Sequence, residues 1–191
     1  MTSETKKIMI VGVGGQGTLL ASRILGNVAI GEGYDVKVSE VHGMSQRGGS
    51  VVTYVKYGEK VYSPIIDRGE ADTILAFELL EAERALPFLK KGGKMIVNSQ
   101  KINPMPVITG AMSYPEDIEK KLGEVVDTTV VDALSLAKEA GNIKSVNVVL
   151  IGVLAKNTNI PYEKWIETIK ATVPPKFVEV NLKAFDLGYN L

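Results

Sequence analysis

The sequence predicts a three-layer α/β/α domain of Rossmann-like type, in which a mostly parallel sheet carries an antiparallel hairpin insertion. Three observations lead to this prediction. An apolar strand pattern at 8–11 runs directly into a glycine-rich turn and a helix. Short apolar runs and helical patterns then alternate along the chain, as they do in parallel α/β proteins. A β-branched and aromatic run at 50–57 interrupts this alternation, since a turn at 58–59 leads to a second extended segment at 60–63.

The remaining elements follow from hydrophobic periodicity and from the glycine, proline and charged residues at their ends. Further strands are expected at 36–40, 72–77, 94–98 and 125–131, and further helices at 18–30, 78–89, 115–122, 133–140, 145–156, 162–171 and 176–189. Residues 90–93 are expected to end the helix at 78–89, and 107–109 to form a short extended piece within a loop. The helix at 145–156 is apolar on nearly all sides, which predicts that it is buried or lies in a subunit interface.

The composition is typical of one soluble domain that spans residues 1–191. The chain is 45% hydrophobic and 23% charged, and its sequence contains no obvious linker or repeat. Lys plus Arg and Asp plus Glu both number 22, so no net field favours binding to nucleic acid or to an anionic membrane. The sequence has no signal-peptide pattern and no apolar run of membrane-spanning length, so a cytoplasmic location is expected.

The residue types that are missing exclude several chemistries. Cysteine is absent, which excludes disulfides, thiol nucleophiles and iron–sulfur or zinc sites with thiolate ligands in this chain. His42 is the only histidine, which excludes a multi-histidine metal site within one chain. No metal site is therefore expected, and any cluster that serves electron transfer would lie in another chain.

Gly12, Gly14 and Gly17 fit the spacing G-x-G-x-x-G at the predicted strand-to-helix turn. This spacing allows a sharp turn and a close approach to a ligand, and the unpaired N–H groups at the helix start attract phosphate. The same pattern also occurs as a tight turn that packs a helix closely without binding a ligand. Thr18 occupies the position where a P-loop needs lysine, and Arg47 the position where a nucleophile elbow needs glycine, so both classes are set aside.

The loop at 42–50 and the glycine turn each follow a predicted strand, so both should lie at the carboxyl edge of the sheet. Ligands in such sheets bind beyond this edge. Together the two loops offer backbone N–H groups, amides, an imidazole and a guanidinium, a set suited to phosphate or carboxylate. The candidate binding residues are Gly12, Gly14, Gly15, Gln16, Gly17, His42, Gln46, Arg47, Gly48 and Gly49. No catalytic residue is assigned from the sequence.

Simpler roles remain open for several of these residues. His42 has no acid at a diagnostic spacing, so it is either a hydrogen-bonding group of the loop or a general base. Arg47 suits a salt bridge to a partner subunit as well as a small anion, and Gly48 with Gly49 suits positive φ angles. Glu40 lies where a dinucleotide enzyme has its ribose-binding acid, and it could instead position the loop.

Residues 11–23 and 39–51 resemble the gamma-type domain of the 2-oxoacid:ferredoxin oxidoreductases, and the beta subunits of the indolepyruvate branch are the nearest match. The string Gly-Met-Ser-Gln-Arg-Gly-Gly in the second segment is more specific than the glycine spacing, although alanine is the residue expected most often at Ser45. The similarity extends through 62–64 to the turn at 92–94, and the chain length suits this subunit.

The resemblance implies the oxidative decarboxylation of indolepyruvate or another arylpyruvate to an acyl-CoA, with reduction of ferredoxin. It also implies that thiamine diphosphate and the iron–sulfur clusters belong to a larger alpha subunit. This chain alone would then hold no cofactor and be inactive, while 14–17 and Arg47 contact coenzyme A or the oxoacid carboxylate. The alternatives are a gamma subunit of a pyruvate or 2-oxoglutarate ferredoxin oxidoreductase, a stand-alone NAD(P)-binding oxidoreductase with Glu40 on the ribose, and a purely structural subunit.

Overall fold

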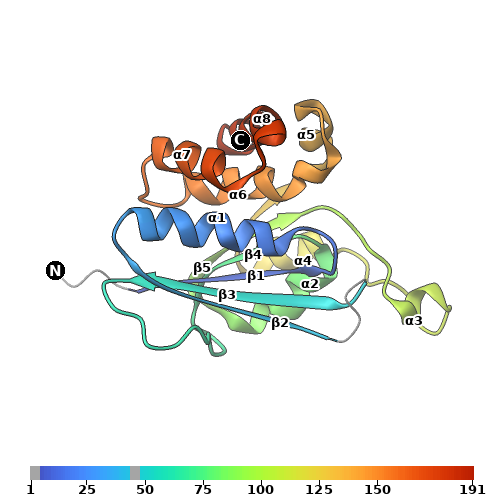
Figure 1. Cartoon of the computed structure of the whole chain (residues 1–191). Coiled ribbons are helices and arrows are strands. Elements are labelled where there is room, and N and C mark those ends of the chain that lie inside the picture. Colours follow the sequence, from blue (N-terminus) through green and yellow to red (C-terminus); the bar gives the residue numbers. More distant parts are fainter. Residues whose placement is uncertain (1–4, 44–47) are drawn as a thin grey trace.

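A six-stranded sheet with the order β2-β3-β1-β4-β5-β6 forms the middle layer of the molecule, and helices cover both of its faces (Figure 1). The structure is a computed structural model that describes residues 5–43 and 48–191. The strands are β1 (Lys6–Val13), β2 (Asp35–His42), β3 (Ser50–Gly58), β4 (Ala71–Ala76), β5 (Leu89–Asn98) and β6 (Asp127–Val131). The α-helices are α1 (Thr18–Gly31), α2 (Leu79–Ala85), α3 (Met105–Ile108), α4 (Ile118–Val125), α5 (Ala133–Ala140), α6 (Val146–Lys156), α7 (Tyr162–Thr172) and α8 (Val178–Tyr189). The predicted three-layer α/β fold is confirmed.

β3 is the antiparallel strand that the sequence predicts, but its partners differ from the prediction. It lies between β1 and β2 and runs antiparallel to both along the full length of each. The neighbours β1-β4, β4-β5 and β5-β6 are parallel. The predicted partner strand at 60–63 is wrong, because β1 and β2 already occupy both hydrogen-bonding edges of β3. Val61 instead donates its N–H to Asp35 Oδ2 at 2.9 Å.

The predicted helix at 78–89 ends earlier than expected. α2 stops at Ala85 and a 3₁₀ turn at 86–88 follows, because the ring of Pro87 removes a backbone donor and clashes with the preceding turn of an α-helix. Residues 90–93 therefore do not cap a helix. They lie in β5, where Gly92 has a φ of 76° and the register against β4 is irregular.

Two predictions near residue 110 are also corrected. Residues 107–109 do not form an extended piece, because a proline in the first turn favours the short helix α3, for which Pro104 is the N-cap. The helix expected at 115–122 begins later, at Ile118, since Asp117 before it has a left-handed φ of 58°.

Alternate side chains of β1 build the two cores of the protein, as the two-residue period of a strand requires. Ile8 and Ile10 belong to the core that also contains residues of α1, α5, α6, α7 and α8, whereas Met9 and Val11 belong to the core on the other face, with residues of α2 and α4. The predicted burial of the apolar helix at 145–156 is confirmed, since α6 is buried from one end to the other apart from its termini. No helix in the described ranges is both long and apolar enough to cross a membrane.

α6 and α8 approach each other so closely that each helix needs glycine at the contact. A Cβ at Gly152 would lie 2.2 Å from the carbonyl oxygen of Phe185. A Cβ at Gly188 would lie 2.0 Å from the carbonyl oxygen of Val149. Both distances are far inside van der Waals contact, so the two helix backbones pack directly on each other.

Candidate functional site

The glycine turn and the loop after β2 lie side by side at the carboxyl end of β1, as the sequence predicts. Val13, the last residue of β1, is paired with Ser50, the first residue of β3. The N–H of Gly14 donates to the carbonyl oxygen of Gly49 at 2.9 Å. This hydrogen bond joins the two loops directly.

The glycines of the turn meet different requirements. A Cβ at Gly12 would lie 2.9 Å from Gln16 Oε1, and a Cβ at Gly17 would lie 2.7 Å from Asn147 Nδ2. Gly17 also has a φ of 84° as the N-cap of α1. Gly15 has a φ of 99°, and no heavy atom of the residues that the structure describes would lie within 4 Å of a Cβ there. Gly12 and Gly17 thus pack tightly within the protein, whereas Gly15 has no close neighbour in the described part of the chain.

The side chain of Gln16 fastens the glycine turn to the neighbouring strands. Its Oε1 accepts from the N–H of Val13 at 2.7 Å. Its Nε2 donates to the carbonyl oxygen of Phe77 at 2.9 Å and to Gln100 Oε1 at 3.1 Å. Because both ends of the amide are occupied, Gln16 holds the turn in shape. The N–H groups of Gly14 and Gln16 donate to the carbonyl oxygens of Gly49 and Val13, so those of Gly15, Gly17 and the first turn of α1 are left to meet a ligand.

An open pocket of about 380 Å³ lies at the start of α1. Its lining residues are Gly14, Gly15, Gly17, Thr18, Leu19, Glu40, His42 and Val51. Among the described residues no side chain caps α1, and the first N–H groups of an α-helix have no partner within the helix. The pocket wall therefore offers backbone donors at the positive end of the helix dipole, an arrangement suited to an anion.

Two polar side chains reach this pocket from β2. The exposed His42 has its Nδ1 3.1 Å from the carbonyl oxygen of Gly43. Glu40 Oε2 accepts from Thr53 Oγ1 at 3.3 Å. Neither contact is a pairing of an acid with a base, so the geometry does not single out a general base.

The structure places the other predicted residues as follows. Gln46 and Arg47 lie outside the described residues. Gly48 has a φ of 82°, the positive angle that the sequence allows for, and Gly49 is the acceptor for Gly14. Within 5–43 and 48–191, no group of three or more histidine, aspartate or glutamate side chains could hold a metal ion.

The position of β3 makes this site different from the nicotinamide-binding site of a dinucleotide enzyme. In dinucleotide-binding units, the acid that binds the ribose follows the strand next to the glycine-rich strand. Here β3 lies between β1 and β2, so Glu40 is two strand spacings, about 10 Å, from β1. Glu40 consequently lines the pocket from its far side.

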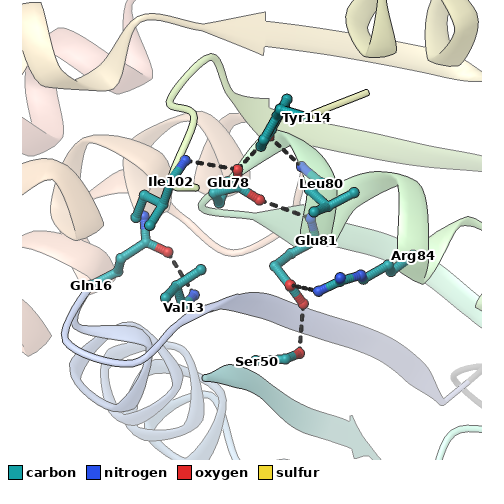
Figure 2. A network of polar contacts seen from close by, with 9 residues as sticks. All are labelled: Val13, Gln16, Ser50, Glu78, Leu80, Glu81, Arg84, Ile102 and Tyr114. Atoms are coloured by element: carbon teal, nitrogen blue, oxygen red, sulfur yellow. Dashed lines mark hydrogen bonds and ion pairs between the residues drawn. The ribbon is translucent and has the colours of Figure 1, made fainter. Parts of the chain in front are cut away.

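Sequence reasoning missed a buried polar network at the end of β4, which Figure 2 shows. Glu78 is only 1% exposed. Its carboxyl group accepts from the N–H of Glu81 at 2.9 Å and from the N–H of Ile102 at 3.0 Å. It also accepts from the hydroxyl of Tyr114 at 2.5 Å, and that hydroxyl accepts from the N–H of Leu80 at 3.1 Å. Glu78 therefore fastens two distant parts of the chain to the start of α2.

Glu81 extends this network to the start of β3. Ser50 Oγ donates to Glu81 Oε2 at 2.5 Å, and Arg84 Nη1 donates to Glu81 Oε1 at 2.6 Å (Figure 2). An acid in the first turn of a helical pattern, here Glu81, is a recognisable signal for a helix start. That signal could not reveal the donors Ile102 and Tyr114, which lie 24 and 36 residues beyond Glu78.

The Tyr114 hydroxyl is held in its protonated form. Burial is the main reason why the pKa of Tyr114 lies well above its ordinary value, and the hydrogen bond to Glu78 raises it further. The phenol therefore remains a donor to Glu78 at neutral pH.

A second cavity of about 170 Å³ lies at the opposite edge of the sheet, beside the buried Tyr57. Burial is the main cause that raises the pKa of Tyr57 to about 12, and nearby Tyr34 and Asp72 add to the effect. The cavity is separate from the glycine edge, because it is lined by residues at the amino ends of β1 and β4.

The raised pKa of Tyr57 predicts a loss of stability in alkali. The neutral phenol is favoured in the folded state, so its contribution is complete below pH 10 and is lost as pH rises through about 12. The free energy of unfolding of the wild type should therefore fall by roughly 2 kcal/mol more than that of Tyr57→Phe between pH 9 and pH 12. Urea denaturation at each pH measures this difference. Tyr62→Phe, at a side chain that is 88% exposed, should follow the wild type, and parallel curves for all three proteins would refute the assignment.

The fold and the pocket together define a Rossmann-like α/β domain whose glycine turn opens on an anion-suited edge. A family model described as pyruvate ferredoxin/flavodoxin oxidoreductase matches residues 7–191. The chain belongs to this family.

Individual relatives place the chain within the family more closely. It is similar to the indolepyruvate oxidoreductase subunit IorB of Pyrococcus horikoshii, with 48% identity over 95% of this chain and 93% of that protein. It is less similar to the pyruvate/ketoisovalerate oxidoreductases common subunit gamma of Thermococcus kodakarensis, with 29% identity over 96% and 95% of the two chains. The solved gamma subunit of a keto/oxoacid ferredoxin oxidoreductase from Geobacter sulfurreducens has 26% identity and a TM-score of 0.73, covering 97% of this chain and 96% of that one. The predicted family resemblance is confirmed.

Proposed function

We propose that this chain, as a single gamma-type domain spanning 1–191, is the accessory subunit of an indolepyruvate ferredoxin oxidoreductase. The observation that carries the proposal is the near full-length similarity to an IorB subunit. The identity to that subunit is 48%, compared with 29% to a pyruvate/ketoisovalerate gamma subunit. In the reaction, indolepyruvate loses CO₂ and two electrons, its acyl group passes to the thiol of coenzyme A, and ferredoxin accepts the electrons. With coenzyme A and ferredoxin as co-substrates, the enzyme would act in the cytoplasm.

We assign thiamine diphosphate and the iron–sulfur clusters to a larger alpha subunit. The chain has no cysteine, so its residues do not fit a cluster with thiolate ligands. Bound in the alpha subunit, thiamine diphosphate would supply the decarboxylation chemistry. The part left to this chain is to bind and orient an anionic group of a substrate.

The pocket at the start of α1 is the part of the chain that we assign to this task. The N–H groups of Gly15 and Gly17 and of the first turn of α1 would hold a phosphate of coenzyme A or the carboxylate of the oxoacid. Gln16 would act as a positioning residue, since its side chain is committed to Val13, Phe77 and Gln100. From the sequence pattern, Arg47 would add a guanidinium that can grip such an anion in a bidentate manner.

Placing a negative charge in this pocket should weaken the binding of coenzyme A. Leu19 is 52% exposed, lines the pocket and lies in the first turn of α1, where a carboxylate favours the helix. Leu19→Glu in the complex with the alpha subunit should raise the KM for coenzyme A or for indolepyruvate about tenfold, the effect of roughly 1.4 kcal/mol of repulsion. Leu19→Gln, which has the same shape without the charge, should stay within about twofold of the wild type. Equal KM values for Leu19→Glu and Leu19→Gln would remove the pocket from substrate binding.

The substrate assignment has a direct test in the same complex. We expect kcat/KM to be highest for indolepyruvate among indolepyruvate, pyruvate and 2-oxoglutarate, measured by the reduction of ferredoxin. A preference for pyruvate or 2-oxoglutarate would replace the indolepyruvate assignment by one of the alternatives within the family. Tight binding of NAD(P) by the isolated chain would instead favour a nicotinamide enzyme.

A further inference from the structure

An uncharged segment follows β5 and stands away from the body of the molecule. No charged residue lies between Lys101 and Glu116, in a chain that is 23% charged. This segment contains α3, which Figure 1 shows projecting outward from the layered core. We call residues 102–114 the arm. Since the arm follows the carboxyl end of β5, it starts at the same edge of the sheet as the pocket.

The tip of the arm carries large apolar side chains in contact with solvent. Met105, Ile108 and Met112 are 65%, 64% and 66% exposed. None of the three belongs to either hydrophobic core. Single exposed apolar residues are ordinary, but three of them on one short uncharged projection are typical of an interaction surface.

The arm is held in a defined shape despite this exposure. At one end the N–H of Ile102, and at the other end the hydroxyl of Tyr114, donate to the same buried carboxyl group of Glu78 (Figure 2). Within the arm, the N–H of Met112 donates to the carbonyl oxygen of Pro106 at 3.0 Å. A segment fixed at both ends loses little conformational entropy when it binds, so it can present apolar side chains at low cost.

We propose that the arm docks into an uncharged socket on the larger, cofactor-bearing subunit, an inference that rests on the proposed function. Methionine and large aliphatic residues are enriched and charges are depleted in the centre of stable subunit interfaces. The arm begins beside the pocket edge, so a subunit that receives it would also face the bound anion. Docking through the arm thus explains how a chain without its own cofactor reaches the reacting centre.

Two other binding partners, a second copy of this chain and a lipid surface, fit the arm less well. A second copy of this chain offers cavities with charged walls, such as Lys6 and Asp72 at one end and Lys101 and Glu119 near α4. These walls do not complement an uncharged tip. A lipid surface would favour flanking cations, whereas the residues that bound the segment, Lys101 and Glu116, carry opposite charges.

A matched pair of substitutions tests the docking. Ile108→Glu places a charge on the arm, and Ile30→Glu places the same charge at the last turn of α1, where Ile30 is 59% exposed. In the complex with a tagged alpha subunit, Ile108→Glu should raise the Kd between the subunits at least about tenfold. Ile30→Glu should leave the Kd unchanged. Both variants should keep the circular dichroism of the wild type, and the Tm should fall by no more than about 4 °C even for Ile30→Glu, whose carboxylate opposes the dipole of α1. Met105→Glu provides a second variant on the arm.

The outcomes separate this proposal from the proposed function. If Ile108→Glu and Met105→Glu bind the alpha subunit as tightly as the wild type, the docking proposal is overturned, whatever the substrate preference. If the Kd rises but the complex prefers another oxoacid, the docking stands and only the substrate assignment fails. If the isolated chain is a dimer that Ile108→Glu converts to a monomer without affecting the alpha subunit, a second copy is the occupant and the proposal is wrong.

Discussion

Gly188→Ala is expected to lower the free energy of unfolding by about 3 kcal/mol or more, because the new methyl group would overlap the backbone of α6. A Cβ at Gly188 would lie 2.0 Å from the carbonyl oxygen of Val149. Backbone atoms cannot move aside as a flexible side chain can, so α8 must shift as a whole. Gly152→Ala should have a similar effect, since a Cβ there would lie 2.2 Å from the carbonyl oxygen of Phe185.

Gly123→Ala is the matched control for this prediction. Gly123 lies within α4, and no heavy atom would lie within 4 Å of a Cβ there. Alanine is the better helix former, so this variant should gain roughly 0.5–1 kcal/mol. Urea denaturation of the three variants beside the wild type gives the comparison. If Gly188→Ala and Gly123→Ala differ by less than about 1 kcal/mol, the two helices do not pack as closely as described.

Glu78→Ala should also cost about 3 kcal/mol or more, because it leaves three donors without their shared acceptor. The N–H groups of Glu81 and Ile102 and the hydroxyl of Tyr114 all converge on this carboxyl group. Each buried donor that loses its partner costs roughly 1–3 kcal/mol. The amide of Ile102 should lose its protection in hydrogen exchange, since it anchors one end of the arm.

Two further variants separate the network from a general loss of stability. Tyr114→Phe removes one donor to Glu78 and the acceptor of the Leu80 N–H, but it leaves the other two hydrogen bonds of Glu78 in place, so it should cost about 2 kcal/mol, less than Glu78→Ala. Glu124→Ala, at an exposed position of α4, should stay within about 0.5 kcal/mol of the wild type. Full protection of the Ile102 amide in Glu78→Ala would show that another group holds the arm.

The parts of the fold that depend on local pattern could be predicted from the sequence. The strand, glycine turn and helix from Lys6 to Gly31 follow from periodicity and glycine spacing, and so does the burial of α6. The partners of β3 could not be predicted in this way. Its run of β-branched residues predicts a strand, but which edges it joins depends on β1, which lies some forty residues earlier in the chain.

The same distinction between local pattern and distant contacts applies to the candidate site. The meeting of the two loops was predictable, because both follow strands that end at one edge of the sheet. The role of Gln16 was not, since its acceptors Phe77 and Gln100 lie 61 and 84 residues away. From the sequence, an amide in a glycine-rich turn is interpreted as a ligand-binding group. Only the folded structure shows that Phe77 and Gln100 lie close enough to accept its hydrogen bonds.

The strand order has a consequence for redesign of this scaffold. Because the domain has a glycine-rich turn, a few substitutions could be expected to convert it to a nicotinamide enzyme. The intervening β3 argues against this, because it sets the acid-bearing strand one step too far from the turn, and side-chain exchange cannot alter the succession of strands. Such a conversion would require a different order of strands in the sheet. The topology of the scaffold therefore limits which ligands it can bind, whatever its side chains are.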